Sequence, residues 1–163
     1  MLRGLWTTFK SMFEKPPTIQ YPEVKRPVRE RFRGRHELKR YDNGLEKCIG
    51  CALCAAACPS DAIFVEAAEN SDDERYSPGE RYASTYEINM LRCIFCGFCE
   101  DACPTEAIVL ESNYEMSYTD RKSAIFTKEM LLVKVPEGGN PTPQKTEPGV
   151  YTRSVPEMKD PVD

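Results

Sequence analysis

Several features that would indicate a catalytic or nucleic-acid-binding role are missing from this sequence. It has no G-x-G-x-x-G fingerprint for a nucleotide, no nucleic-acid-binding motif and only one histidine, His36. A lone histidine more often packs or hydrogen bonds than carries protons, although a proton-linked role stays open for His36. No signal peptide opens the chain, so we do not expect a secreted disulfide framework. We therefore expect no catalytic residue in this chain.

The eight cysteines form two copies of the spacing C-x2-C-x2-C-x3-C-P, which is typical of bacterial ferredoxins that hold 4Fe–4S clusters. Three closely spaced thiolates can occupy three corners of one cubane, and in two-cluster ferredoxins the fourth cysteine reaches across to the other cluster. We therefore predict two 4Fe–4S clusters as cofactors. The ligands predicted for the first cluster are Cys48, Cys51, Cys54 and Cys103, and those for the second are Cys93, Cys96, Cys99 and Cys58.

Zinc binding and disulfide bonding are the alternatives for these cysteines. A zinc site needs four ligands, however, and leaves unexplained the third cysteine of each triplet, the x3 spacing and the proline that follows. No ligand position is replaced by Asp, so nothing indicates a three-iron cluster. Because thiolates occupy all four iron positions of each predicted cluster, neither cluster offers an open iron to a substrate.

The duplication extends past the ligands, since residues 48–66 align with residues 93–111 without a gap at an offset of 45. In each copy, small residues beside the third cysteine predict a short helical turn that the proline ends. Short apolar runs predict three strands. They are Ile63–Val65, Ser84–Asn89 and Ile108–Leu110. These elements predict an α+β fold with a pseudo-twofold duplicated, bacterial-type two-cluster ferredoxin core over residues 45–112.

Apolar side chains around the cysteines are expected to exclude water, and two glycines are expected to let backbone amides approach the sulfurs. The apolar residues are Ile49, Leu53, Ile63, Ile94, Phe95, Phe98 and Ile108, and the glycines are Gly50 and Gly97. Burial lowers the reduction potential of a cluster and hydrogen bonds to its sulfurs raise it, so the two effects oppose one another here.

Residues 1–17 predict an amphipathic helix that ends at Pro16-Pro17. Its apolar residues follow one helical stripe. They are Leu2, Leu5, Trp6, Phe9, Met12 and Phe13. The segment is much shorter than the ~20 apolar residues that span a bilayer. Such a helix can pack on its own core, but a ferredoxin core closes itself, so we expect residues 2–13 to lie at a membrane surface or against a membrane subunit.

Residues 18–44 predict an extended basic arm, because prolines interrupt any helix and Lys and Arg are frequent there. Nucleic-acid binding is the usual inference from such charge, but no motif accompanies it, so we expect no nucleic-acid partner. In an extended chain Arg31, Arg33 and Arg35 would share one face. We expect these arginines to pair with carboxylates of adjacent subunits or with lipid phosphates, while Gly34 allows a neighbour to approach closely.

Residues 113–135 predict one more helix, over Asn113–Leu132, with Thr119 or Asp120 as its cap. Residues 136–163 are rich in Pro and Gly and poor in large apolar side chains, so they predict an irregular tail that cannot fold alone. A small core with a basic arm on one side and such a tail on the other indicates a subunit of a hetero-oligomer.

Several sequence blocks together resemble the subunit I family of NADH–quinone oxidoreductase, respiratory complex I. They are the N-terminal helix, Thr18-Ile19-Gln20-Tyr21-Pro22, Arg31-Phe32-Arg33-Gly34-Arg35-His36-Glu37-Leu38, and the cysteine runs that begin Cys48-Ile49-Gly50-Cys51 and Cys93-Ile94-Phe95-Cys96. The resemblance covers about residues 5–135 and is more specific than the cysteine spacing, which many ferredoxin-like proteins share.

This resemblance implies a non-catalytic electron-transfer subunit of the peripheral arm, at the cytoplasmic face of the bacterial inner membrane. Its partners would be other peripheral-arm subunits and a membrane subunit at the quinone site. The first cluster would receive the electron, and the second would pass it toward the terminal cluster that reduces quinone. Two other interpretations stay open: the ferredoxin-like subunit of a membrane hydrogenase or formate-oxidising complex, and a structural adapter whose clusters only brace the fold.

Overall fold

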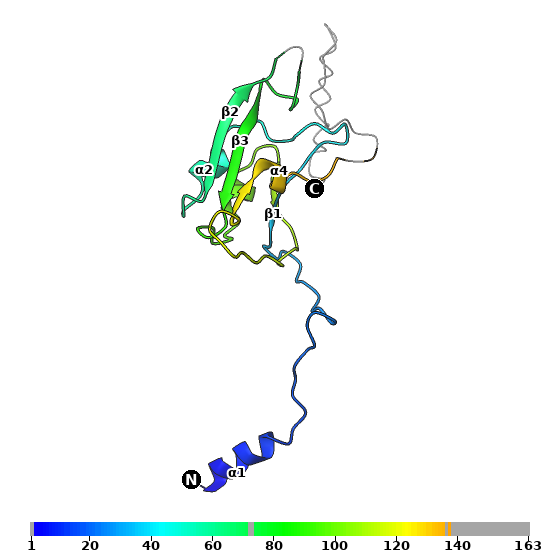
Figure 1. Cartoon of the computed structure of the whole chain (residues 1–163), viewed down its shortest axis with the longest axis vertical. Coiled ribbons are helices and arrows are strands. Elements are labelled where there is room, and N and C mark those ends of the chain that lie inside the picture. The colour runs from blue at the N-terminus through cyan, green and yellow to red at the C-terminus, as the bar shows by residue number, and fades with distance from the viewer. Residues whose placement is uncertain (1, 72–73, 136, 138–163) are drawn as a thin grey trace, which may run out of the picture. The chain divides into compact units, whose positions relative to one another are not determined.

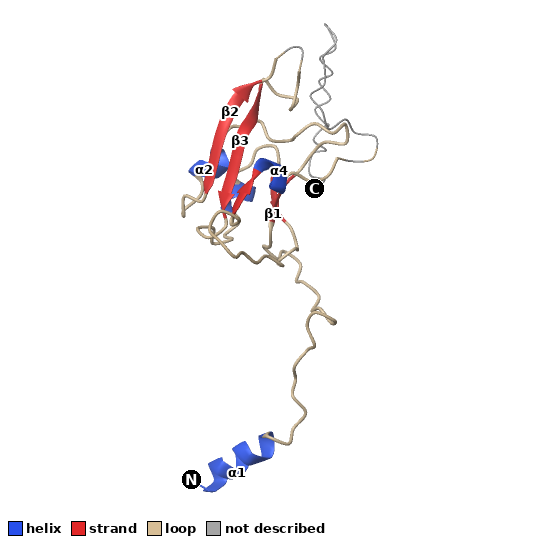
Figure 2. Cartoon of the chain, in the orientation of Figure 1, coloured by secondary structure: helices blue, strands red, loops and turns tan. Residues whose placement is uncertain are grey.

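The structure, a computed structural model, describes residues 2–71, 74–135 and 137; the tail predicted over residues 136–163 lies outside them apart from Glu137. The chain divides into two compact units between Glu30 and Arg31. The first unit contains α1 (Leu2–Ser11), and the second contains the other helices and strands (Figures 1 and 2). In chain order these are β1 (His36–Leu38), α2 (Leu53–Ala56), β2 (Ile63–Glu69), β3 (Arg81–Asn89), α3 (Phe98–Asp101), β4 (Ile108–Leu110), β5 (Ile125–Thr127) and α4 (Lys128–Leu131).

The strands form two antiparallel sheets, and each sheet joins the two sequence copies. β2, which ends the first copy, pairs with β3, which leads into the second copy, and places Ile63 opposite Ile88. β4, which ends the second copy, pairs with β1, which leads into the first, and places Ile108 opposite Leu38. β5 adds a strand on the other side of β3. Backbone hydrogen bonds therefore tie each copy to the other, and the two copies fold as one unit.

One hydrophobic core draws side chains from all five strands and from α2, α3 and α4. Tyr86, Ile88 and Ile108 are each at most 1% exposed. Burying an isoleucine such as Ile88 or Ile108 stabilises a fold by about 1.5–3 kcal/mol. Cys54 and Cys99 belong to the same core, so the cysteine loops are packed against it rather than laid on the surface.

The predicted strands and helical turns are present, but the prediction of one helix over Asn113–Leu132 is wrong. Only the single turn of α4 is helical, and the β-branched and aromatic run Ile125–Thr127 forms β5 instead. The edge of β3 offers backbone groups to that run, and pairing with it outweighs helix propensity. Asp120 does cap a turn, because its Oδ1 accepts a hydrogen bond from the Ser123 amide at 2.8 Å, but that turn does not start a helix.

The arm predicted over residues 18–44 is not one element, because the second compact unit begins at Arg31. Arg31 has a left-handed backbone (φ 61°), which breaks the extended alternation. Arg35 turns into the fold, where its guanidinium donates to the Met130 carbonyl at 2.8 Å and lies over the Phe126 ring. The prediction that the three arginines share one outward face is therefore wrong.

Gly34 does allow a close approach, but the approaching backbone belongs to this chain. The Gly34 amide donates to the Glu111 carbonyl at 2.9 Å. A Cβ at position 34 would collide with the carbonyl oxygens of Glu111 and Asn113. The glycine is therefore required by the segment that follows β4 and not by a partner subunit.

We expect Gly34→Ala to destabilise the second unit by about 1–3 kcal/mol, the usual result of forcing extra atoms into a packed site. The measurement is the urea midpoint of the cluster-loaded protein under anaerobic conditions. Gly4→Ala in α1 is the matched control, because a Cβ there meets nothing within 4 Å. Equal midpoints for Gly34→Ala and the parent would contradict the close approach.

Candidate metal centres

Both cysteine loops turn on residues with left-handed backbones at equivalent positions. Three pairs recur at the offset of 45: Gly50 and Phe95 (φ 65° and 53°), Ala52 and Gly97 (58° and 85°), and Asp61 and Glu106 (48° and 50°). Residues other than glycine are strained in this conformation, so the surrounding loop must hold them there. The duplication seen in the sequence is therefore a duplication of backbone geometry as well.

The fourth cysteine of each copy accepts a hydrogen bond from the backbone of the turn that follows it. The Ala62 amide donates to Cys58 Sγ at 3.3 Å, and the Ala107 amide donates to Cys103 Sγ at 3.2 Å. In both copies the residue before the alanine is the left-handed one, which reverses the chain and turns the next amide back to the sulfur. Two cysteines distant in sequence thus have the same local surroundings.

Hydroxyl groups lie beside the same two sulfurs, Ser60 Oγ at 3.5 Å from Cys58 and Thr105 Oγ1 at 3.7 Å from Cys103. Burial acts to raise the pKa of the Cys58 thiol, but the Ser60 hydroxyl and nearby backbone amides together bring it below its usual value. The same balance lowers the pKa of Cys103. The sequence analysis did not identify Ser60 and Thr105, and the signal that could have done so is a hydroxyl at the same position of both copies.

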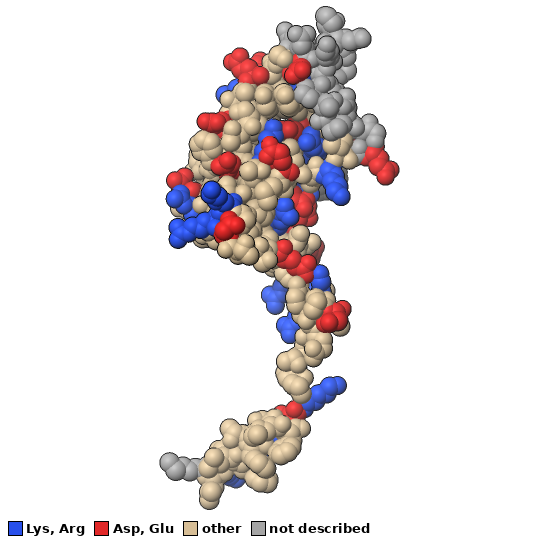
Figure 3. All heavy atoms as spheres, viewed as in Figure 1, with Lys and Arg blue, Asp and Glu red and all other residues tan. Residues whose placement is uncertain are grey.

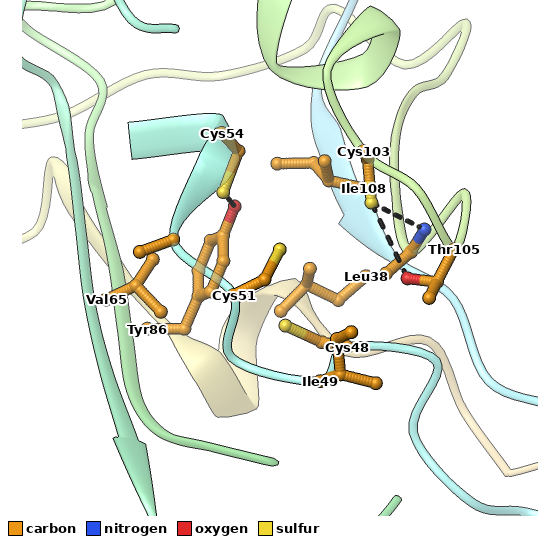
Figure 4. A pocket seen from close by; sticks show the side chains of 12 residues that line it. Leu38, Cys48, Ile49, Cys51, Cys54, Val65, Tyr86, Cys103, Thr105 and Ile108 are labelled. Atoms are coloured by element: carbon orange, nitrogen blue, oxygen red, sulfur yellow. Dashed lines mark hydrogen bonds between the residues drawn. The ribbon is translucent and has the colours of Figure 1, made fainter. Parts of the chain in front are cut away.

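The three cysteines Cys48, Cys51 and Cys54 of the first copy line one pocket together with Cys103 of the second (Figure 4). Their sulfurs lie around the same space (Figure 4). Apolar side chains complete the wall: Leu38, Ile49, Val65, Ala107 and Ile108. The structure therefore brings together the four residues predicted for the first cluster, while their ligation stays a prediction.

Cys58 of the first copy lies beside the second triplet. Burial raises the pKa of the Cys93 thiol, and the neighbouring thiolates of Cys58 and Cys96 raise it further. Burial also raises the pKa of Cys99 to about 12, with a contribution from Cys93. The four residues predicted for the second cluster are thus close enough to interact electrostatically, in the crossed combination.

Backbone amides approach the first cysteine of each triplet at equivalent positions. Burial raises the pKa of the Cys48 thiol to about 11, and a hydrogen bond from the Gly50 amide opposes this effect. In the second copy the Phe95 amide donates to Cys93 Sγ at 3.4 Å. The predicted role of Gly50 is therefore observed, whereas its counterpart is Phe95 rather than Gly97. Metal coordination deprotonates a thiol outright, so iron binding at these buried positions releases protons.

Two buried polar side chains that the cysteine spacing does not reveal also contact the sulfurs. Tyr86 Oη lies 3.3 Å from Cys54 Sγ, and burial raises the pKa of this phenol well above its usual value, so a neutral hydroxyl faces the sulfur (Figure 4). His36 Nε2 lies 3.8 Å from Cys93 Sγ, and burial lowers the pKa of its imidazole to about 4. The position of His36 favours hydrogen bonding over proton carriage. No sequence signal marks either contact, because both partners come from outside the cysteine runs.

The apolar residues expected to exclude water do so only in part. Ile63 and Ile108 are buried, but Leu53, Ile94 and Phe98 are 49%, 62% and 52% exposed. Leu53 and Phe98 begin α2 and α3 and directly precede the buried third cysteines. Adjacent residues of a helix point about 100° apart, so an inward cysteine leaves its neighbour outward. The prediction is wrong for these three residues.

The donor atoms fit clusters rather than disulfides, since all eight cysteines are free thiols. Within the part of the chain that the structure describes, no three His, Cys, Asp or Glu side chains converge on a single-ion site. In a cubane each thiolate binds a different iron, so the four ligands stand apart. Thiols in two groups of four, with amide and hydroxyl donors directed at their sulfurs, match what two cubanes require.

Residues 47–107 match the family model described as a 4Fe–4S dicluster domain. This span contains all eight cysteines, which fit two 4Fe–4S clusters, and the predicted cofactors and the mixed α and β fold are confirmed. The chain is also similar to a chain of the membrane-bound sulfane sulfur reductase (MBS), an archaeal respiratory membrane complex, with 31% sequence identity and a TM-score of 0.48. The match covers 72% of this chain and 55% of that chain, so this chain spans about half the length of that relative.

We expect Cys58→Ala to damage the cluster of the second triplet more than that of its own triplet, because Cys58 lies beside Cys93. Cys103→Ala is the mirrored control and should damage the first cluster. The measurement is the iron content and the electron paramagnetic resonance (EPR) spectrum of each variant after dithionite reduction. If Cys58→Ala removed the first cluster and spared the second, the crossed arrangement would be refuted.

Proposed function

We propose that the 4Fe–4S dicluster domain relays electrons between redox partners within a respiratory membrane complex. The observation that carries this proposal is that the first group of four cysteines, Cys48, Cys51, Cys54 and Cys103, is complete and lines one pocket. A cluster with thiolate on all four irons exchanges single electrons and offers no site to a substrate. The function that remains for two such clusters in one small domain is to pass electrons on.

The positions of the two centres support a relay between them. Burial is the largest cause that raises the pKa of the Cys99 thiol. The Cys54 thiolate of the other centre is close enough to raise this pKa further. Both cysteines are buried in the same core, and Tyr86 lies within it as well. Packed side chains rather than water thus separate the centres, and the amide and hydroxyl donors stabilise the extra negative charge of a reduced cluster.

We further propose that the complex is NADH–quinone oxidoreductase and that the chain belongs to its peripheral arm. The support is the resemblance of α1, the Thr18–Pro22 block, the Arg31–Leu38 block and both cysteine runs to the subunit I family. By this resemblance the first cluster receives the electron and the second passes it toward the cluster that reduces quinone. The subunit would act at the cytoplasmic face of the bacterial inner membrane without catalysing either terminal reaction.

The helix α1 supports attachment at a membrane surface. Its stripe is open to solvent, with Leu2, Trp6 and Phe13 exposed at 85%, 69% and 76%, and the Trp6, Phe9 and Phe13 rings follow one another along it. The visible face of the helix is almost free of charged side chains (Figure 3). No helix in the described residues is both long enough and apolar enough to cross a bilayer. An apolar stripe on a short helix is suited to lie in the interface plane.

The test of this function is NADH reduction of the purified assembly followed by freeze-quenched EPR. We expect both clusters to be reduced within the turnover time and reoxidised on addition of quinone. Clusters that stay oxidised during turnover would indicate a structural adapter. Clusters that respond to hydrogen or formate but not to NADH would indicate the alternative class of membrane complex.

We expect Trp6→Glu combined with Phe9→Glu to release the peripheral arm from the membrane while both clusters keep their spectra. Each substitution places a charge where about 1.5–3 kcal/mol of apolar burial is expected. The measurement is the fraction of NADH-dehydrogenase activity that sediments with membranes after a low-salt wash. Thr7→Glu with Ser11→Glu, on the opposite face of the helix, is the matched control. Normal sedimentation and quinone reduction in the Trp6/Phe9 variant would exclude a docking role.

A further inference from the structure

Arg33 lies against the loop that carries the second triplet. The carbon position that a side chain at Gly97 would occupy is 2.8 Å from Arg33 Nε and 3.3 Å from Arg33 Cζ. Gly97 stands between Cys96 and Cys99, so the guanidinium rests on the cysteine loop itself. The sequence analysis expected this arginine to reach a partner subunit, and its observed neighbour is the cluster-binding backbone of its own chain.

The first cysteine loop carries an alanine at the position equivalent to Gly97. Ala52 is the counterpart of Gly97 and has the same left-handed backbone, with φ of 58° against 85°. The first loop therefore has a methyl group at the position where the second loop has none and contacts Arg33. Alanine adopts the left-handed conformation at position 52 with φ of 58°, whereas the φ of 85° at position 97 itself favours glycine. Contact with Arg33 supplies the additional reason.

His36 approaches the same centre from the same segment. It is 1% exposed, its Nε2 lies 3.8 Å from Cys93 Sγ, and its ring packs on Phe95 with centroids 5.5 Å apart. Its Nδ1 is buried and has no hydrogen-bond partner. A neutral imidazole carries one proton on one of its two nitrogens, and the Cys93 sulfur is the acceptor within reach of Nε2. The tautomer protonated at Nε2 is therefore favoured, because it donates a hydrogen bond to that sulfur.

We propose that Arg33 and His36 raise the reduction potential of the second cluster selectively. Reduction adds one negative charge to a cluster, and a nearby guanidinium or an N–H donor to sulfur stabilises that charge. On the first loop the nearest atoms to the Gly50 position belong to Tyr82 and Ala67, with no guanidinium among them, and the Tyr86 hydroxyl is the donor that faces Cys54. This inference rests on the proposed ligation of the second cluster and deepens the proposed relay, because a higher potential makes that cluster the better electron acceptor.

The test is an EPR-monitored redox titration of the purified assembly, in which the two cluster signals are assigned with the Cys58→Ala and Cys103→Ala variants. We expect Arg33→Gln to lower the equilibrium constant for reducing the second cluster about fivefold to tenfold, where tenfold corresponds to 59 mV for one electron. Arg33→Lys keeps the positive charge and should leave the reduction potential of the second cluster close to that of the parent. His36→Phe keeps an aromatic ring beside Phe95 and should lower the same potential. The first cluster should not shift in any of these variants.

Gly97→Ala adds a methyl group that would displace the guanidinium, and it also strains the left-handed backbone of the loop, so the double variant with Arg33→Gln is needed to separate the two effects. We expect Gly97→Ala to lower the second potential as Arg33→Gln does, and the double variant to show no further shift, since both substitutions remove one interaction. Ala52→Gly is the matched control in the first loop. The side chains of Arg31 and Arg33 are both exposed, but only Arg33 supplies the nearest atoms to the Gly97 position. Arg31→Gln removes an equal charge two residues away and should shift the potential less than Arg33→Gln.

Three outcomes would overturn the proposal. One is an unchanged second potential in Arg33→Gln, and another is an equal shift of both clusters. The third is an equal effect of Arg31→Gln and Arg33→Gln, which would mean that total charge rather than the Gly97 contact acts. If His36→Phe fails to assemble, the Arg33 and Gly97 variants still test whether the Arg33 contact raises the potential of the second cluster. Failure of NADH to reduce the clusters would refute the proposed complex but leave these potentials measurable with dithionite.

Discussion

The crossing of one cysteine from each copy to the triplet of the other copy is the constraint on which the rest of the structure depends. Cys103 can stand beside Cys48 and Cys54 only if the second copy folds back onto the first. The strands also pair between the two copies, since β4 pairs with β1 and β2 pairs with β3. Ligands and backbone ladders thus connect the same two halves. The free energy of metal binding at these cysteines therefore also stabilises the folded state of the whole core.

Features that the duplication repeats are those that hold a cluster, and features that it does not repeat are those that distinguish one cluster from the other. Left-handed residues, amide donors and the Ser60 and Thr105 hydroxyls recur at the offset of 45. Tyr86 of β3 and His36 of β1 stand at equivalent register positions, opposite Val65 and Leu110, but they are different residues and contact different cysteines of their triplets. The repeated parts provide equal ligation, whereas the strands leading into each copy provide different electrostatic surroundings.

The cysteine spacing predicted the cofactors, and the small residues and apolar runs beside it predicted the helical turns and the short strands, because each of these depends on residues close together in the chain. The parts that it missed depend on contacts between distant segments. The run Ile125–Thr127 became a strand because the edge of β3 was available, although its neighbours favour a helix. Arg35 turned inward because the Phe126 ring and the Met130 carbonyl lie opposite it. A pattern of residues along one segment contains no information about such partners.

The pairing of β1 with β4 and of β2 with β3 has a consequence for how this domain could have arisen. Each copy places its strand beside the other copy, and Cys103 of the second copy lies in the pocket of the first triplet, which is the relation between the two protomers of an isologous dimer. A chain with a single copy would have three ligands and an open strand edge, and two such chains could satisfy one another about a twofold axis. Joining them into one polypeptide removes the dependence on protomer concentration. It also allows each half to acquire its own substitutions, as Ala52 and Gly97 show.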